Sequence, residues 1–179
     1  MSESELEQLR YPIGRHEPNP AFGMSHLKMC IADFEKLPYD LELAVSHLTD
    51  AELETPYRPG GWTIRQVVNH CADSHSNGLI RLKLALTETN PTVKPYLEAA
   101  WANLPDSREF DIKPALQILY GTHARWVTLL HHLQEADLSR TYEHPQYQAR
   151  YTIAHLVSLY AWHGRHHFNH IRIAKESFA

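Results

Sequence analysis

Four histidines crowd into about two helical turns within the stretch LYAWHGRHHFNHIRIA, which covers residues 159–174. At about 100° per residue, His163 and His167 fall on one face of a helix, one turn apart. The same face carries Leu156 and Tyr160, so the two histidines continue an apolar stripe that should face a core and not water. Two buried imidazoles with this spacing need partners, and a metal ion is one such partner.

The HxxxH spacing of His163 and His167 is shared by metal clamps and by ordinary packed or solvated histidine pairs. The spacing alone gives equal weight to both. Gly164 stands where a zinc protease of the HExxH type would carry its catalytic glutamate, which excludes that class. Two imidazoles also leave a divalent ion too open to be held well, so a third ligand must come from another part of the chain.

The third ligand has several candidates. Periodicity places His75 nearer the apolar face of a second predicted helix and His70 on its polar border, and it does not choose between them. Cys71 has the chemistry of a metal ligand, but it points about 100° away from His70 and should pack as a small apolar residue. His123 and His155 are further candidates that are better explained as structural or surface histidines. The residues alone therefore leave the third ligand open.

Length and composition predict one globular domain over residues 1–179. A chain of 179 residues with 43% hydrophobic content can bury one sizeable core. The net charge of −4 and the scattered arginines give no basic surface for nucleic acid. No apolar run approaches the roughly 18 residues of a membrane span, and the acidic start MSESELEQLR is unlike a signal peptide. We therefore expect a cytoplasmic protein with neither nucleic acid nor membrane as partner.

The spacing of apolar residues predicts four long amphipathic helices. Thr63 and Gln66 form a capping-box pattern that starts the second helix, and Pro114 suits the first turn of the third. Pro38 should kink or interrupt the first helix. With no convincing run of alternating strands, the chain is predicted to be an all-α four-helix bundle. The helices are expected at about 25–48, 63–88, 111–134 and 153–177.

Prolines predict the irregular segments. Residues 1–23 are expected to form an irregular N-terminal arm because Pro12, Pro18 and Pro20 oppose regular structure. The connection over residues 89–111 is longer than the roughly 12–15 residues beyond which a structureless loop is usually either functional or disordered. Its aromatic residues favour an ordered lid. Residues 140–151 alternate weakly, as in a short hairpin. The bundle is thus expected to carry long ordered loops.

Two long stretches of the sequence resemble one known family. The runs ETPYRPGGWTIRQVVNHCADSH (residues 54–75) and LYAWHGRHHFNHI (residues 159–171) are similar to the YfiT branch of the DinB-like superfamily of bacterial metal-binding four-helix bundles. The resemblance extends over most of the chain, including the early YPIG. In that family, the histidine of a VVxH element and both histidines of the HxxxH bind the metal. The resemblance therefore implies His70, His163 and His167 as ligands of one divalent ion per chain, with zinc or nickel expected.

The resemblance also implies an activity. Relatives of this branch are bacillithiol transferases, more distant members use mycothiol or glutathione, and many members are described as metal-dependent hydrolases. Three neutral imidazoles leave a dication its positive charge and open positions, where a thiol or water loses its proton near neutral pH. We therefore expect a transferase that activates a bacillithiol-like thiol to attack an electrophile. The alternatives are a metal-dependent hydrolase and a non-catalytic metal-binding stress protein.

Three polar residues near His70 are candidates for binding the substrate. Asp73, one turn after His70, could orient that histidine or accept a proton, or it could be a helix-surface carboxylate. Arg81 could bind a carboxylate of an acidic thiol, or it could form a surface ion pair. Asn77 lies on the same polar stripe. The assembly that we expect is a homodimer.

Overall fold

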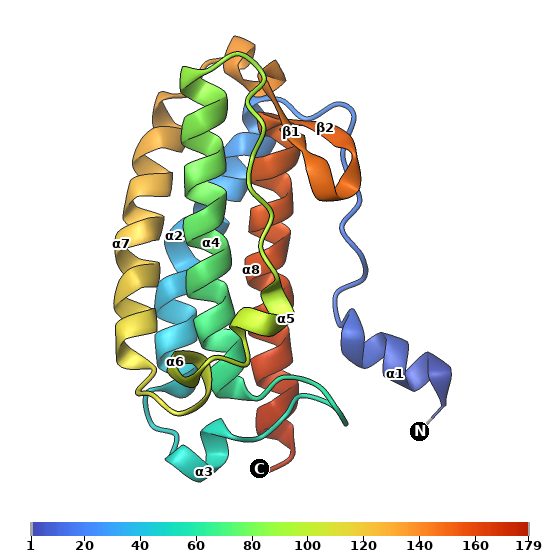
Figure 1. Ribbon diagram of the computed structural model, residues 1–179, viewed down its shortest axis with the longest axis vertical. Coiled ribbons are helices and arrows are strands. Elements are labelled where there is room, and N and C mark those ends of the chain that lie inside the picture. The colour runs from blue at the N-terminus through green and yellow to red at the C-terminus, as the bar shows by residue number, and fades with distance from the viewer. Residues whose placement is uncertain (1, 179) are drawn as a thin grey trace.

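The computed structural model describes residues 2–178, and their main feature is a bundle of four long helices. Figure 1 shows these helices lying side by side over most of the length of the molecule. They confirm the predicted all-α four-helix bundle, and their ends lie within a few residues of the predicted ones. The four helices are α2 (Met24–Val45), α4 (Ile64–Thr87), α7 (Lys113–His132) and α8 (Ile153–Glu176).

The order of the helices around the bundle differs from a simple up-and-down arrangement. α2 and α4 each pack against α7 and α8. In Figure 1, α2 and α8 run in one direction, whereas α4 and α7 run in the other. The reason is the connection between α4 and α7, which returns along the length of the bundle and carries the short helices α5 (Glu98–Trp101) and α6 (Pro105–Arg108). Because of this return, α4 and α7 are parallel neighbours.

The starts and interruptions of the helices follow local chemistry. The Thr63 hydroxyl accepts from the Gln66 backbone N–H, and the Gln66 side chain accepts from the Thr63 backbone N–H, which confirms the capping box. Pro38 does not interrupt α2, contrary to one of the two outcomes expected for it. Its neighbours Leu37 and Leu41 are buried in the core, so packing holds the helix together although a backbone hydrogen bond is lost.

The prediction of an irregular arm over residues 1–23 is wrong for Glu3–Arg10, which form the helix α1. Ser2 and Glu5 make a capping box, because the Ser2 hydroxyl accepts from the Glu5 backbone N–H and the Glu5 carboxylate accepts from the Ser2 backbone N–H. Acidic residues in its first turn and Arg10 in its last turn also suit the helix dipole. The prolines behind the prediction all follow Arg10, where the backbone is irregular.

The predicted hairpin is present and is joined to the lid. Strands β1 (Thr141–His144) and β2 (Ala149–Thr152) pair antiparallel. Residues 91–93 of the lid lie beside β1, where the Val93 N–H donates to the Glu143 carbonyl and the Glu143 N–H donates to the Pro91 carbonyl. The lid is therefore ordered, as predicted. The remaining short elements are α3 (Asp50–Leu53) and the 3-10 turns η1 (Glu135–Ser139) and η2 (Pro145–Tyr147).

The core consists of two apolar clusters with buried histidines between them along the helices. On α4, His75 lies between Cys71 of one cluster and Leu79 of the other. On α7, His123 lies between Leu119 and Trp126, which also belong to different clusters. The bundle thus has a polar layer at mid-height. Within residues 2–178, no helix is both long enough and apolar enough to cross a membrane.

Candidate metal centre

The three histidines implied as ligands come together in the structure. His70 projects from α4, whereas His163 and His167 project from adjacent turns of α8. One ring nitrogen from each of the three lies within 4.8 Å of those of the other two. The Nε2 atoms of His70 and His163 are 3.1 Å apart, and the ring centroids of His163 and His167 are 4.4 Å apart. The bundle therefore brings one histidine of α4 against the HxxxH pair of α8.

The chemistry of this trio fits a divalent ion. Two nitrogens bound tetrahedrally to one zinc ion at about 2.0–2.1 Å lie roughly 3.3–3.4 Å apart, close to the separation between His70 and His163. Burial, and then the nearby His170, lowers the pKa of His70 to about 4. Burial and neighbouring imidazoles also hold the pKa values of His163 and His167 well below the usual 6.5. All three imidazoles are therefore neutral at pH 7, which is the form that binds a metal.

Two further histidines lie behind the trio: His75 contacts His163, and His123 contacts His75. His75 Nε2 is 3.2 Å from His163 Nδ1, and His123 Nε2 is 3.0 Å from His75 Nδ1. Sequence periodicity does not choose between His70 and His75 as a ligand, and the structure places His75 behind His163. Cys71 is buried in an apolar cluster, as expected.

A second group of histidines shares one member with the trio. His166, His167 and His170 also bring three ring nitrogens within 4.8 Å of one another. His170 Nδ1 is 3.3 Å from His167 Nδ1, and the His166 ring stacks on Trp162 with centroids 4.5 Å apart. The Nδ1 atom of His166 is buried without a hydrogen-bond partner. The sequence shows the cluster of four histidines over residues 163–170 of α8 but indicates no role for His166 or His170.

A pocket of about 620 Å³ opens beside the trio, and we call it the histidine pocket. The trio forms one part of its wall, and the lid and the hairpin add further residues. Glu98 comes from α5 in the lid, and Tyr142 and His144 come from β1. The connection predicted to be a lid therefore reaches the site. His155, one of the alternative ligands, also lines this pocket, and its ring stacks on Tyr151.

The three predicted substrate residues separate in the structure. Arg81 lines the histidine pocket, and its Nη1 donates to the Tyr160 hydroxyl at 3.3 Å. Asp73 and Asn77 are not among the residues that line it. Burial and then Asp106 raise the pKa of Asp73 to about 6, and no hydrogen bond within residues 2–178 joins Asp73 to His70. Of the three, only Arg81 is brought to the pocket.

Gly78 allows this wall of the pocket to form. A Cβ at Gly78 would lie 2.5 Å from Cζ of Tyr160, so only a residue without a side chain lets the Tyr160 ring lie directly on α4. The ring then places its hydroxyl beside Arg81, one helical turn further along. Sequence analysis gave no role to Gly78, because the close approach depends on a ring from α8.

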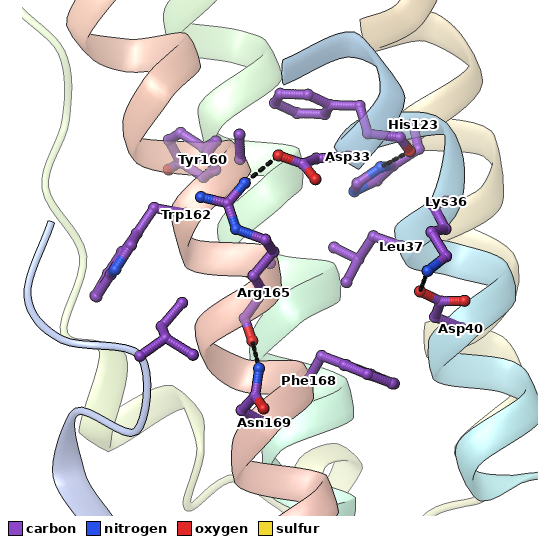
Figure 2. A pocket seen from close by; sticks show the side chains of 14 residues that line it. Asp33, Lys36, Leu37, Asp40, His123, Tyr160, Trp162, Arg165, Phe168 and Asn169 are labelled. Carbon is purple, nitrogen blue, oxygen red and sulfur yellow. Dashed lines mark hydrogen bonds and ion pairs between the residues drawn. The ribbon is translucent and has the colours of Figure 1, made fainter. Parts of the chain in front are cut away.

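A second pocket, of about 360 Å³, lies between α2 and α8, and we call it the ion-pair pocket. Figure 2 shows Arg165 of α8 reaching Asp33 of α2, and Lys36 reaching Asp40 along α2. Tyr160 and Trp162 line this pocket and also the histidine pocket. The two pockets are therefore neighbours across α8.

Comparisons with known proteins agree with this site. A sequence model described as the DinB superfamily matches residues 33–171. A protein of Bacillus mycoides (strain KBAB4), named "Putative metal-dependent hydrolase", is 46% identical over 171 residues, which cover 96% of this chain and 98% of the relative. A protein of Bacillus cereus (strain G9842) with the same descriptive name is 47% identical over 166 residues, covering 93% of this chain and 95% of the relative.

The structural comparison gives the same answer. YfiT from Bacillus subtilis, described as "a probable metal-dependent hydrolase with an unusual four-helix bundle topology", superposes with a TM-score of 0.92 at 41% identity, covering 96% of this chain and 98% of YfiT. The parallel neighbours α4 and α7 fit that description of the topology. The fold, the extent of the sequence match and the histidine trio lead to one conclusion: the chain belongs to the DinB superfamily.

Proposed function

We propose that this protein is a metal-dependent enzyme that activates a low-molecular-weight thiol for attack on an electrophilic substrate. His70, His163 and His167 would hold one divalent ion, with zinc or nickel suited to three imidazoles. Bound there, the ion would stabilise the thiolate form of a coordinated thiol near neutral pH. The names of the relatives support a metal-dependent enzyme, and the thiol as substrate is our proposal.

The observation that carries the proposal is the unpaired cation of Arg81 in the histidine pocket. Within residues 2–178, Arg81 makes no ion pair within 4 Å, so the alternative that it serves a surface ion pair loses support. The charge nearest in effect is Glu98 of the lid, whose pKa burial raises and Arg81 lowers. Its guanidinium donates to Tyr160 and keeps other N–H groups for a ligand. An arginine in this position suits a carboxylate on the thiol, as an acidic thiol such as bacillithiol would provide.

The reaction that these residues suit is a substitution at carbon. The thiol sulfur forms a bond to the electrophilic carbon, and the bond from that carbon to its leaving group breaks, with the electron pair going to the leaving group. The thiol proton leaves to solvent. Arg81 binds the carboxylate of the thiol, and the ring of Tyr160 against Gly78 fixes the direction of the guanidinium. This chain therefore contributes binding and orientation.

A second candidate is a hydrolase, which the names of the relatives favour. A metal ion in the trio would lower the pKa of a bound water, but hydrolysis also usually uses a base or acid that moves a proton during attack and departure of the leaving group. Among the described residues that line the histidine pocket, Glu98 is the single carboxylate, and it is exposed. Burial, and then a neighbouring imidazole, lowers the pKa of His155 to about 4 and that of His166 to about 3, so both of these rings are weak bases. A thiol needs less help from a base, because its proton is already weakly held. This difference makes the thiol transferase our first choice.

The experiment combines cobalt substitution with a panel of thiols. With the correct thiol, the cobalt protein should gain a sulfur-to-metal charge-transfer band, and thiol should be consumed when a halide or epoxide electrophile is added. Arg81→Met should raise KM about tenfold for a carboxylate-bearing thiol, which corresponds to about 1.4 kcal/mol, and should leave KM for a neutral thiol unchanged. His70→Ala should remove both the band and the turnover.

Two results would overturn this proposal. Cleavage of an ester or amide without thiol, together with no thiol-dependent band, would establish the hydrolase. One tightly bound metal with turnover of neither substrate class would establish the non-catalytic metal-binding protein.

A further inference from the structure

Nδ1 of His163, the ring nitrogen that does not face His70, contacts a second buried imidazole, which contacts a third. The third imidazole is hydrogen-bonded to a backbone carbonyl. His123 Nδ1 lies 2.7 Å from the Phe34 carbonyl oxygen, which can only accept a hydrogen bond, so Nδ1 must carry the proton. Burial lowers the pKa of His123 to about 4, and the neutral ring therefore holds this one proton. Nε2 of His123 is left as an acceptor.

The same reasoning fixes the next two rings. His75 Nδ1 lies 3.0 Å from His123 Nε2 and must donate to it, which leaves His75 Nε2 as an acceptor. His163 Nδ1 lies 3.2 Å from His75 Nε2 and must donate in turn. The lone pair of His163 is then on Nε2, the atom that faces His70. We call the row His163, His75 and His123 the long imidazole chain.

A similar row of hydrogen bonds fixes the proton position of His167. His170 Nε2 lies 3.2 Å from the carbonyl oxygen of Arg10, the last residue of α1, and must donate to it. His170 Nδ1 then accepts from His167 Nδ1 at 3.3 Å, which leaves the lone pair of His167 on Nε2. Tyr57 stacks on His170 with ring centroids 3.8 Å apart and so holds the plane of that ring. We call His167 and His170 the short imidazole chain.

We propose that these two chains fix the proton positions of His163 and His167, so that both Nε2 lone pairs face the metal site. His75, His123 and His170 are then positioning residues, and α1 supports the site through the Arg10 carbonyl. This inference rests on the proposed metal site. A neutral imidazole can carry its proton on either nitrogen, and partners of this kind typically change metal affinity by about 10–100-fold.

The first test reads the proton positions without metal. In metal-free protein labelled with ¹⁵N-histidine, NMR at pH 8 should find the proton on Nδ1 of His163, His75, His123 and His167, and on Nε2 of His170. A proton on Nε2 of His163 or of His167 would overturn the corresponding chain. Because this measurement uses no metal, it tests the chains even if the proposed function fails.

The second test measures metal affinity by competition with a chelator. His75→Leu and His170→Leu should each weaken zinc binding about 10–100-fold and shift the d–d bands of the cobalt protein, because the hydrogen bond to the ligand is lost. His75→Gln keeps an acceptor for His163 Nδ1–H and should lose less affinity. His144→Leu is the control, since His144 is buried beside the same pocket but lies outside both chains.

Three outcomes would overturn the inference or the function beneath it. If both leucine variants bind zinc within twofold of the original protein and keep its cobalt spectrum, the chains do not position the ligands. If the original protein binds two equivalents and His170→Leu binds one, then His166, His167 and His170 hold a second ion and the short chain is wrong. If the original protein binds no metal, the proposed function fails, and the NMR result alone decides the chains.

Discussion

The histidine pocket and the ion-pair pocket lie on either side of α8, and they differ in whether their charged groups form ion pairs within the chain. In the ion-pair pocket, Arg165 pairs with Asp33 and Lys36 pairs with Asp40, so these charged groups have partners within the chain (Figure 2). In the histidine pocket, Arg81 has no ion pair within residues 2–178, and three imidazoles converge. Charged groups that pair with one another serve the fold, whereas a half-buried cation without an ion pair and three imidazoles whose ring nitrogens converge are available to a ligand.

The largest expected effect is the loss of metal when a histidine of the trio is replaced, whereas a replacement in the ion-pair pocket should leave the metal content unchanged. His163→Ala or His167→Ala should abolish stoichiometric metal binding, because two remaining imidazoles hold a divalent ion poorly. Helicity should stay nearly unchanged, since the two apolar clusters are intact. Elemental analysis and circular dichroism measure both quantities. Arg165→Gln is the matched control on the same helix, and metal loss there would end the distinction between the pockets.

Much of the fold was readable because its signals are local. The capping box of Thr63 and Gln66 and the apolar periodicity are visible in single segments. Ser2 and Glu5 carry the same kind of local signal, which predicts α1, whereas the prolines that oppose regular structure all follow Arg10. The parallel placement of α4 and α7 depends on the path of the lid, which local pattern does not fix.

Less of the metal site than of the fold could be predicted from the sequence. The HxxxH of α8 indicated two ligands, and resemblance supplied His70. The hydrogen bonds of His75 to His123 and His163 join three helices, so spacing along one helix does not reveal them. Asp73 illustrates the opposite error, because its nearness to His70 in sequence suggested a role in a pocket that it does not line.

The next effect is on the pH dependence of stability. His123 reaches the ion-pair pocket, and burial lowers its pKa to about 4. Below pH 6.5 the unfolded chain takes up a proton that the folded chain does not, so the free energy of unfolding falls by about 1.4 kcal/mol per pH unit for this histidine. Above pH 6.5 both states are neutral and the contribution is constant.

Urea denaturation of metal-free protein at pH 7.5, 6.5 and 5.5 measures this slope. His123→Gln should flatten the slope between pH 6.5 and 5.5 by up to about 1.4 kcal/mol per unit, whereas the exposed His132→Gln should leave it unchanged. Equal slopes for His123→Gln and the original protein would mean that His123 is not buried as a neutral ring.

The two pockets also differ in how tightly a glycine in each is packed. An added Cβ at Gly78 meets the Tyr160 ring at 2.5 Å, and an added Cβ at Gly164 meets the end of the Leu37 side chain at 2.5 Å. A ring wedged on α4 gives way less easily than the tip of a leucine. Gly78→Ala should therefore destabilise by about 1–3 kcal/mol, and Gly164→Ala by less than about 1 kcal/mol, since alanine favours the helix. Urea denaturation measures both, and a larger loss at Gly164 would reverse this ranking.

The smallest expected effect is at the Asp33–Arg165 pair. Their side chains are 31% and 49% exposed, and exposed pairs are worth about 0–1 kcal/mol. Burial raises the pKa of Asp33 even though Arg165 favours its charged form, so the pair gains little over the cost of burying the carboxylate. Asp33→Asn should therefore change the free energy of unfolding by less than about 1 kcal/mol and leave metal content intact. A loss of metal in this variant would show that the ion-pair pocket supports the metal site across α8, and the contrast between the two pockets would then be wrong.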